Sequence, residues 1–190
     1  MKTTILCDRE SRAFGGIDVA LQVQSAVQET GSEARLIELN GDELNPCFGC
    51  FHCWVKTPGL CIQTNDKANT IAGFQMQSDV LIILSKITYG GYSCDIKSFL
   101  DRSIPNLSPF FENVNGEMHH KMRYERFPVT ISIGYGDYTD QEYGTFKKLA
   151  ERNALNMRPP EHFVFAIKNP GETGGVMQEL RGFYKKETSL

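Results

Sequence analysis

Apolar residues along the chain follow two patterns that alternate. Short runs of strand length are separated by segments in which apolar residues recur every three or four positions, as on one face of a helix. The strand-length runs are Thr3–Cys7, Ala34–Leu39, Asp79–Ser85, Val129–Ile133 and His162–Ile167. The segments with helical spacing are Gly15–Thr30, Asp66–Met76, Cys94–Leu107, Gln141–Asn156 and Val176–Lys185. Strands and helices therefore alternate along the chain.

This alternation predicts an α/β fold with a five-stranded parallel sheet and helices on both faces. The third run, DVLIILS, is almost continuously apolar, as expected of a central strand buried on both sides. Because crossovers are right-handed, the doubly wound strand order 2-1-3-4-5 is the simplest solution. We expect residues 1–190 to form one domain, with a cysteine-rich loop at 45–64 and a C-terminal tail from residue 168.

Three loops at one edge of this sheet share an unusual composition. In a doubly wound sheet, ligands bind beyond the carboxyl ends of the strands at the point where the order reverses. The loops that follow the first, third and fourth strands are Asp8–Gly16, Lys86–Ser93 and Gly134–Asp140. Glycines allow close backbone approach, and tyrosines offer flat faces. The three loops together predict a site for a flat aromatic ligand that carries a phosphate.

The candidate contacts fall into two groups. Ser11 and Arg12 lie just before a predicted helix, where backbone N–H groups suit a phosphate. The candidate ring contacts come from the other two loops and are Ile87, Thr88, Tyr89, Gly90, Gly91, Tyr92, Gly134, Tyr135, Gly136 and Tyr138. No residue is assigned a catalytic acid or base role.

Composition narrows the class of protein. The chain has 190 residues, of which 41% are hydrophobic and 23% charged, as in ordinary globular domains. Twenty Lys and Arg against 23 Asp and Glu give a formal charge of −3, which is unlike a strongly basic nucleic-acid binder. No apolar run approaches the roughly 20 residues of a membrane helix, and the first residues do not resemble a signal peptide. We therefore expect a cytoplasmic protein without a nucleic-acid or membrane partner.

Four of the six cysteines fall within 15 residues, at Cys47, Cys50, Cys53 and Cys61. In a reducing compartment, clustered cysteines indicate metal or redox chemistry more often than disulfides. Three cysteines at two-residue spacing with a fourth close by are nearer to an iron–sulfur pattern than to the two separated pairs of a structural zinc site. A [4Fe–4S] cluster, a zinc ion and a metal-free group of thiols all stay open.

Three further residues are given structural roles. We expect Cys94, which opens a predicted helix, to be buried in the core. We expect His119 and His120 to lie in a solvated loop, within the polar stretch NGEMHHKMRYER.

The segment ITYGGYSCDIKSFLDRS, residues 87–103, resembles a known family. It is similar to the second flavin loop and the following helix of the flavodoxin-like, FMN-dependent NAD(P)H oxidoreductases. That group includes the NADPH-dependent FMN reductases, the multimeric flavodoxin-like quinone reductases and the iron–sulfur flavoproteins. The features that match are Gly90, Gly91, Tyr92, Ser93, Lys97, Asp101 and Arg102. The segment PCFGCFHCWVKTPGLC, residues 46–61, lies where iron–sulfur flavoproteins carry their compact cysteine motif.

Two departures from the family pattern concern the flavin site. The first loop reads CDRESRAFGGID, whereas the family usually has Gly-Ser-Pro-Arg followed by an Asn-Thr or Asn-Ser pair. The proline that begins the second loop is replaced by Lys86. The resemblance implies a flavodoxin-like fold, bound FMN, NAD(P)H as a transient substrate, and homodimers or homotetramers.

The primary functional hypothesis is an oxidoreductase that passes electrons from NAD(P)H through FMN to a quinone, a flavin or a similar acceptor. An alternative is an electron-transfer protein with FMN and a [4Fe–4S] cluster held by the four clustered cysteines, serving a protein redox partner. A third is a flavin-free binding module on the same fold, suggested by the altered first loop.

Overall fold

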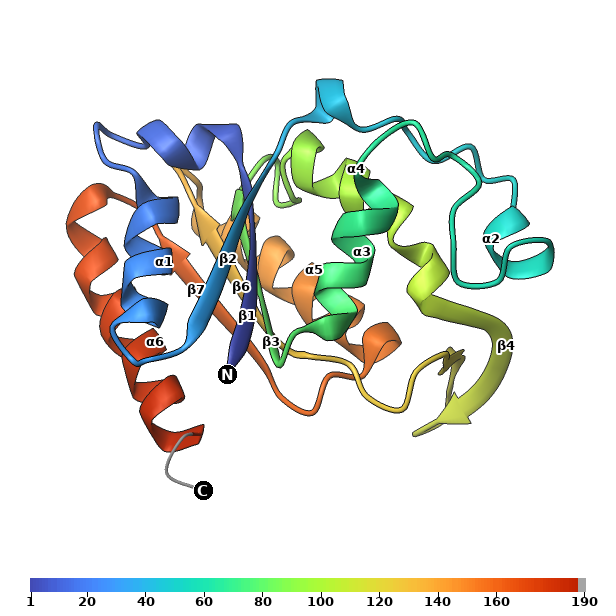
Figure 1. Ribbon diagram of the computed structural model, residues 1–190. Coiled ribbons are helices and arrows are strands. Elements are labelled where there is room, and N and C mark those ends of the chain that lie inside the picture. The colour runs from blue at the N-terminus through green and yellow to red at the C-terminus, as the bar shows by residue number, and fades with distance from the viewer. Residues whose placement is uncertain (188–190) are drawn as a thin grey trace.

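A computed structural model describes residues 1–187, and its centre is a five-stranded parallel sheet (Figure 1). The strand order is β2-β1-β3-β6-β7, and every neighbouring pair is parallel. These strands are β1 (Lys2–Asp8), β2 (Glu33–Leu39), β3 (Val80–Lys86), β6 (Val129–Tyr135) and β7 (His162–Ile167). Counted within the sheet they have the order 2-1-3-4-5, which confirms the predicted topology.

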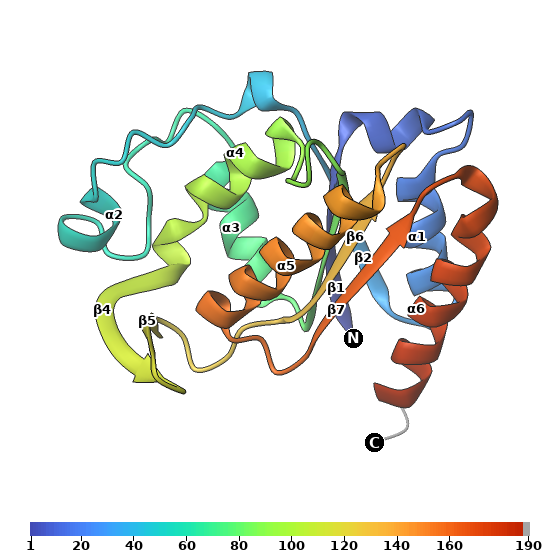
Figure 2. The ribbon, with the colours of Figure 1, turned by 180° about the vertical axis from the view of Figure 1, so that it is seen from behind.

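Helices cover both faces of the sheet, as Figures 1 and 2 show from opposite sides. The helices α1 (Val19–Gln28) and α6 (Thr173–Glu187) lie on one face. The opposite face carries α3 (Ala68–Gln77), α4 (Cys94–Arg102) and α5 (Asp140–Met157). A short helix, α2 (His52–Val55), lies away from the sheet in the cysteine-rich loop. Among residues 1–187, none of the helices combines the length and apolar character needed to cross a bilayer.

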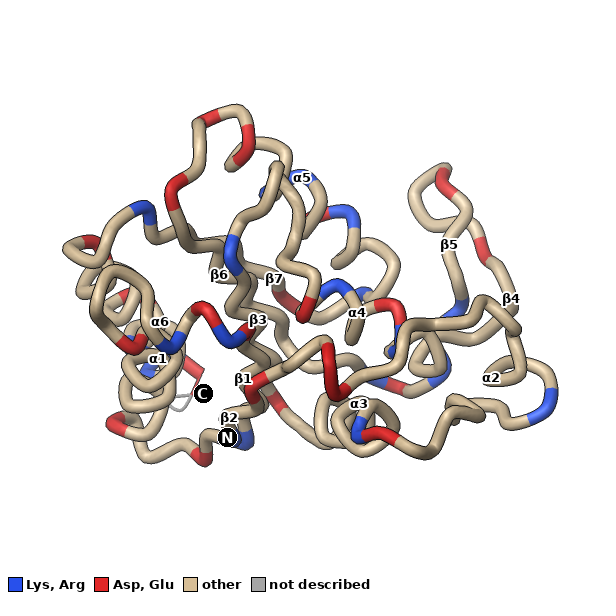
Figure 3. The backbone as a smooth tube through the Cα atoms, turned by 90° about the horizontal axis from the view of Figure 1, so that it is seen from above, with Lys and Arg blue, Asp and Glu red and all other residues tan. Residues whose placement is uncertain are grey.

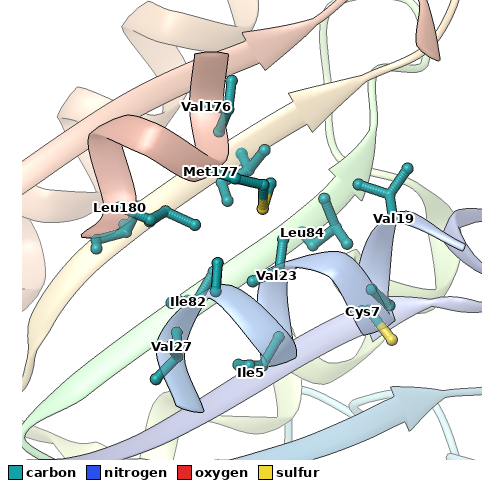
Figure 4. Packing of buried hydrophobic residues seen from close by; sticks show 14 of the residues in the cluster. Ile5, Cys7, Val19, Val23, Val27, Ile82, Leu84, Val176, Met177 and Leu180 are labelled. Atoms are coloured by element: carbon teal, nitrogen blue, oxygen red, sulfur yellow. The ribbon is translucent and has the colours of Figure 1, made fainter. Parts of the chain in front are cut away.

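The alternation of side chains along β3 explains the two cores. Ile82 and Leu84 pack with α1 and α6, as Figure 4 shows, whereas Leu81 and Ile83 pack with the helices of the other face. All four are at most 4% exposed. Burying a large aliphatic side chain stabilises the fold by about 1.5–3 kcal/mol. The near-continuous apolar run therefore reflects a strand covered on both sides.

The loop after β1 is more ordered than its sequence predicts. Residues Arg9–Ala13 form a short 3-10 helix, η1, and α1 begins only at Val19. Asp18 caps α1, because its carboxylate accepts a hydrogen bond of 2.8 Å from the backbone N–H of Leu21. The predicted helix start at Gly15 is therefore four residues too early. Gly15 itself has a φ of +56°, which belongs to the turn before the cap.

A β-hairpin that the sequence did not predict follows α4. Its strands are β4 (Leu107–Val114) and β5 (Glu117–Met122), which pair antiparallel outside the main sheet. The helix predicted over Cys94–Leu107 ends at Arg102, and 3-10 residues Ile104–Asn106 (η3) lead into the hairpin.

The two histidines of the hairpin correct a prediction. His119 and His120 lie in β5 rather than in a solvated loop, and His119 is only 5% exposed. The ring of His119 hydrogen-bonds Asn156 of α5 at 3.0 Å and Glu117 at 3.1 Å. The contact with Asn156 joins the hairpin to α5, so a stretch that is polar in sequence becomes ordered through long-range packing.

Candidate functional site

The carboxyl edge of the sheet brings the three predicted loops together around one buried carboxylate, Asp8. Asp8 is the last residue of β1 and is completely buried. It accepts hydrogen bonds from the backbone N–H of Ser11 at 3.1 Å and of Lys86 at 2.7 Å. The hydroxyl of Tyr135, at the end of β6, donates a third. Asp8 therefore links the loop after β1 to the ends of β3 and β6.

The burial of Asp8 also affects the pKa of its carboxyl and that of the neighbouring Tyr135 phenol. Loss of water raises the pKa of this carboxyl above its ordinary value, although the hydrogen bonds from Tyr135, Lys86 and Ser11 favour the charged form and oppose the shift. Burial likewise raises the pKa of the Tyr135 phenol, and the neighbouring Asp8 charge adds to that effect. Tyr135 therefore stays protonated and acts as a donor.

The two predicted phosphate contacts are both engaged within the protein. Ser11 is completely buried, and its hydroxyl donates to the backbone carbonyl of Asp8 at 2.6 Å. The guanidinium of Arg12 lies between two carboxylates, with Nε 3.3 Å from Asp18 and 3.5 Å from Glu38. Neither side chain is arranged to receive a phosphate in this conformation.

The loop after β3 ends in a tight turn that presents an aromatic ring to solvent. Thr88 and Gly91 exchange backbone hydrogen bonds of 3.0 and 2.9 Å. Tyr89 lies at the tip with a φ of +50° and is 93% exposed. A non-glycine residue in this backbone region is uncommon and marks a position worth a functional hypothesis.

The turn is held against α5 through Gly90. A β-carbon at this position would lie 2.7 Å from the β-carbon of Thr145 in α5, and its φ is +76°. Both observations require glycine here. The exposed Tyr89 is therefore presented by a turn that is fixed on its other side.

The other predicted ring contacts belong mostly to the interior. Ile87, Tyr92, Gly134, Tyr135 and Tyr138 are all buried. The rings of Tyr92 and Phe146 meet edge to face at 5.2 Å, and Tyr138 lies 5.8 Å from Tyr143. Gly136, also buried, has a φ of +123° and donates its N–H to Ile167. Thr88, Tyr89 and the half-buried Gly91 are the predicted ring contacts that solvent reaches.

The four clustered cysteines line one cavity at the far end of the molecule. Cys47, Cys50, Cys53 and Cys61 surround a space of about 340 Å³ between the cysteine-rich loop and the C-terminal end of α4. Cys53 lies in α2 and is buried, Cys61 is half-buried, and Cys47 and Cys50 are exposed. The sequence spacing thus brings all four thiols to a common space.

A buried ion pair anchors both ends of this loop. Arg102, the last residue of α4, binds Asp66 through two nitrogens at 2.7 and 3.1 Å, and both side chains are at most 2% exposed. The same guanidinium donates to the carbonyl of Asn45 at 2.7 Å and to that of Gln63 at 3.2 Å. Asn45 precedes the first cysteine and Gln63 follows the last, so Arg102 fixes the two ends of the segment that bears the thiols.

One nitrogen of Arg102 has no partner in the protein. Its Nε is buried without a hydrogen bond, while Arg102 itself lines the cysteine cavity. Burial alone would lower the pKa of the guanidinium, but the hydrogen-bonded Asp66 carboxylate raises it, and the nearby Cys61 sulfur adds to that effect. A buried donor without a partner is rare and calls for an acceptor.

The thiols influence one another electrostatically. Burial raises the pKa of the Cys53 thiol, and Cys61, Cys47 and Cys50 raise it further. Without a metal the Cys53 thiol therefore favours its protonated form. A bound metal reverses this because it takes thiolates as ligands.

The donor set suits a polynuclear iron–sulfur cluster. Thiolates are soft ligands, and a [4Fe–4S] cluster takes four cysteines, one on each iron, so its ligands surround a volume rather than a point. Within residues 1–187 no group of three or more His, Cys, Asp or Glu side chains is arranged to hold a single metal ion.

Cys94 stands apart from the cavity and is exposed, so the prediction that it is a core residue is wrong.

The surface around the cavity is apolar. Trp54 of α2 stacks on Phe51 at 5.2 Å, and its indole N–H donates to the carbonyl of Leu107 at 3.0 Å. Several large apolar side chains of the cysteine loop and the hairpin are exposed: Phe48, Phe51, Val55, Leu60, Ile62, Phe110, Phe111 and Met118. Exposed apolar surface of this extent is typical of an interaction site.

Sequence reasoning missed the roles of Asp8 and Arg102. Asp8 was visible as a carboxylate at the end of the first strand, in the place where the family pattern has small residues. Arg102 was noted as part of the Asp-Arg pair that ends α4, without a function. Their partners lie far along the chain, 78 residues from Asp8 to Lys86 and 36 from Asp66 to Arg102.

Comparison with known proteins agrees with this architecture. No family model matches the chain. An iron–sulfur flavoprotein from Methanocaldococcus jannaschii is 37% identical over 81 residues, which are 43% of this chain and 40% of that protein. The chain spans about two fifths of the length of the curated relatives it matches.

Solved structures share the fold across nearly the whole chain. A quinone reductase, described as putative, from Klebsiella pneumoniae superposes with a TM-score of 0.67 at 10% identity, covering 96% of this chain and 83% of that one. Oxidised flavodoxin 1 from Bacillus cereus superposes with a TM-score of 0.57 at 13% identity, covering 97% and 98%. The chain therefore has a flavodoxin-like fold, and over 43% of its length it is similar in sequence to an iron–sulfur flavoprotein.

Proposed function

We propose that this chain is an oxidoreductase of the iron–sulfur flavoprotein type, which transfers electrons with a [4Fe–4S] cluster and a flavin. The observation that carries the proposal is the cavity lined by Cys47, Cys50, Cys53 and Cys61. The buried, unpaired Nε of Arg102 supports it, because a cluster sulfur or a ligating thiolate would accept its hydrogen bond. The similarity to an iron–sulfur flavoprotein gives independent support.

The residues of the cavity would perform distinct tasks. The four thiolates would hold the cluster, which supplies one-electron redox chemistry when bound. Arg102 and Asp66 would keep the ends of the loop fixed so that the thiols stay at the cavity.

FMN is the flavin indicated by the family resemblance and by an FMN-dependent azoreductase of the same fold. The residues at the sheet edge suit the ring system of FMN better than its phosphate. The exposed ring of Tyr89 and the glycine-containing turn beneath it suit an aromatic ring system. The predicted phosphate contacts Ser11 and Arg12 do not fit, because both are engaged elsewhere.

NAD(P)H is the proposed electron source, and a quinone, a flavin or a redox protein the proposed acceptor. A quinone reductase among the structural neighbours supports this class of reaction. The exposed apolar side chains around the cysteine loop and hairpin support association with a second copy of the chain, as a homodimer or homotetramer.

Metal analysis of anaerobically prepared protein tests the proposal. We expect about four iron and four sulfide per chain, with a broad visible absorbance that disappears when the cluster is destroyed. Acid denaturation should release the flavin separately, so the two groups are counted independently. Protein that binds less than about one iron per chain after anaerobic reconstitution would rule out the cluster.

A further inference from the structure

We infer that Asp8 makes the carboxyl edge of the sheet discriminate against phosphate, so that a flavin bound there is held by its ring. FMN should then bind no more tightly than riboflavin, which has the same ring and ribityl chain but no phosphate. The inference rests on the proposed function in that it takes the flavin to bind at this edge.

Two backbone donors at this edge, the N–H groups of Ser11 and Lys86, are already occupied. A phosphate at this edge would accept hydrogen bonds from backbone N–H groups of the loop after β1. Here the N–H of Ser11 and the N–H of Lys86 both donate to the Asp8 carboxylate, and the Tyr135 hydroxyl donates to it as well. The Asp8 carboxylate thus takes the place that the phosphate of a bound ligand would occupy.

The second group of N–H donors in this loop is also capped. Helix α1 begins with Asp18, whose carboxylate accepts from the N–H of Leu21. A phosphate brought to the start of α1 would meet the negative charge of this carboxylate. The carboxylates of Asp8 and Asp18 therefore each bind a backbone N–H at the start of η1 and of α1.

The cations at this edge are likewise neutralised. Arg9 pairs with Asp42 and Asp95, Arg12 with Asp18 and Glu38, and Lys86 with Glu10. In these pairs, and with Asp8 added, three cations face six carboxylates: Asp8, Glu10, Asp18, Glu38, Asp42 and Asp95. Figure 3 views this edge and shows the acidic and basic segments interspersed along the loops. A dianionic phosphate would be repelled by the excess negative charge.

Flavin titrations of the purified protein test the inference directly. Binding of FMN and of riboflavin would each be followed by the quenching of flavin fluorescence. We expect the two dissociation constants to agree within about threefold, because the phosphate gains no hydrogen bonds. FMN that binds about tenfold or more tightly than riboflavin would overturn the inference.

Substitutions of Asp8 test whether this one carboxylate weakens phosphate binding, as distinct from the net negative charge of the protein. We expect Asp8→Ser to tighten FMN binding about tenfold, because it frees the N–H groups of Ser11 and Lys86 for the phosphate. Riboflavin, which has no phosphate, should gain no affinity. Asp8→Asn removes the charge but keeps the shape, and it should give a smaller gain. Glu179→Gln is the matched control, since it removes one exposed carboxylate of α6, which is not part of the three loops.

Thermal unfolding with each flavin provides a second readout. Because a ligand that binds only the folded state raises the unfolding temperature, FMN should stabilise Asp8→Ser more than riboflavin does. If the wild type binds neither flavin and Asp8→Ser binds FMN, the inference is supported. If Asp8→Ser binds neither flavin, or binds both equally, the inference is wrong, while the iron and sulfide contents still decide the proposed function separately.

Discussion

Replacing Cys53 with alanine is expected to reduce the iron content of anaerobically reconstituted protein from about four to less than about one per chain. Cys53 is the buried member of the four cysteines that line the cavity, and it lies in the short helix α2. Loss of its thiolate leaves three ligands and one exposed iron, which makes the cluster labile. Iron and sulfide analysis with visible absorbance measures the change.

The same experiment contains its own control. Cys94→Ala removes an exposed cysteine that does not line the cavity, so its iron content should match that of the wild type. Cys50→Ala removes an exposed cysteine that does line the cavity, and its iron content should fall like that of Cys53→Ala. Equal iron contents in all three variants would show that these cysteines do not hold the cluster.

The sheet could be predicted from the sequence because its strands are buried on both faces. Burial of β3 between two helical layers requires apolar residues at consecutive positions, and the sequence from Val80 to Leu84 shows them directly. The turn at Gly90 was similarly visible, since a glycine is needed where the backbone approaches α5. The apolar run and the glycines of the turn are each visible over a few neighbouring positions, although the contact of Gly90 with Thr145 of α5 spans 55 residues.

The hairpin could not be predicted in the same way. Its strands β4 and β5 are exposed along much of their length, and β5 includes Glu117, His120 and Lys121. What orders them is pairing with each other and the contact of His119 with Asn156 of α5, 37 residues away. A local hydrophobic pattern holds no information about such a contact.

The meeting of the three loops could be predicted from the sequence, but the hydrogen bonds that they make could not. The three loops do meet at the carboxyl edge, as the strand order requires. The partners of Asp8, however, include Tyr135, which is 127 residues away, so the sequence does not reveal that the carboxylate occupies the loop's donors. The cysteine cavity was easier to predict, because the four cysteines that line it lie within 15 residues.

Replacing Asp66 with asparagine is expected to lower the free energy of unfolding of the cluster-free protein by about 3–5 kcal/mol at pH 7. The Arg102 and Asp66 side chains are 0% and 2% exposed, so removal of one charge leaves the other buried without its partner. Urea denaturation measures the difference. Asp101→Asn is the matched control, because Asp101 pairs with Lys97 on the surface and should cost less than about 1 kcal/mol.

The pH dependence of this difference tests its electrostatic origin. Burial alone would raise the pKa of Asp66, but hydrogen bonds from Arg102 and from the N–H groups of Ala68 and Asn45 outweigh it and lower the pKa. Because the pKa is lower in the folded state than the value of about 3.9 in the unfolded chain, the stabilisation is complete above that pH. It is lost as the pH falls through the folded-state pKa, since the protonated acid then resembles asparagine. The difference in the free energy of unfolding between wild type and Asp66→Asn should therefore become smaller in acid. A difference that is the same at every pH would mean that Asp66 acts through shape and not through charge.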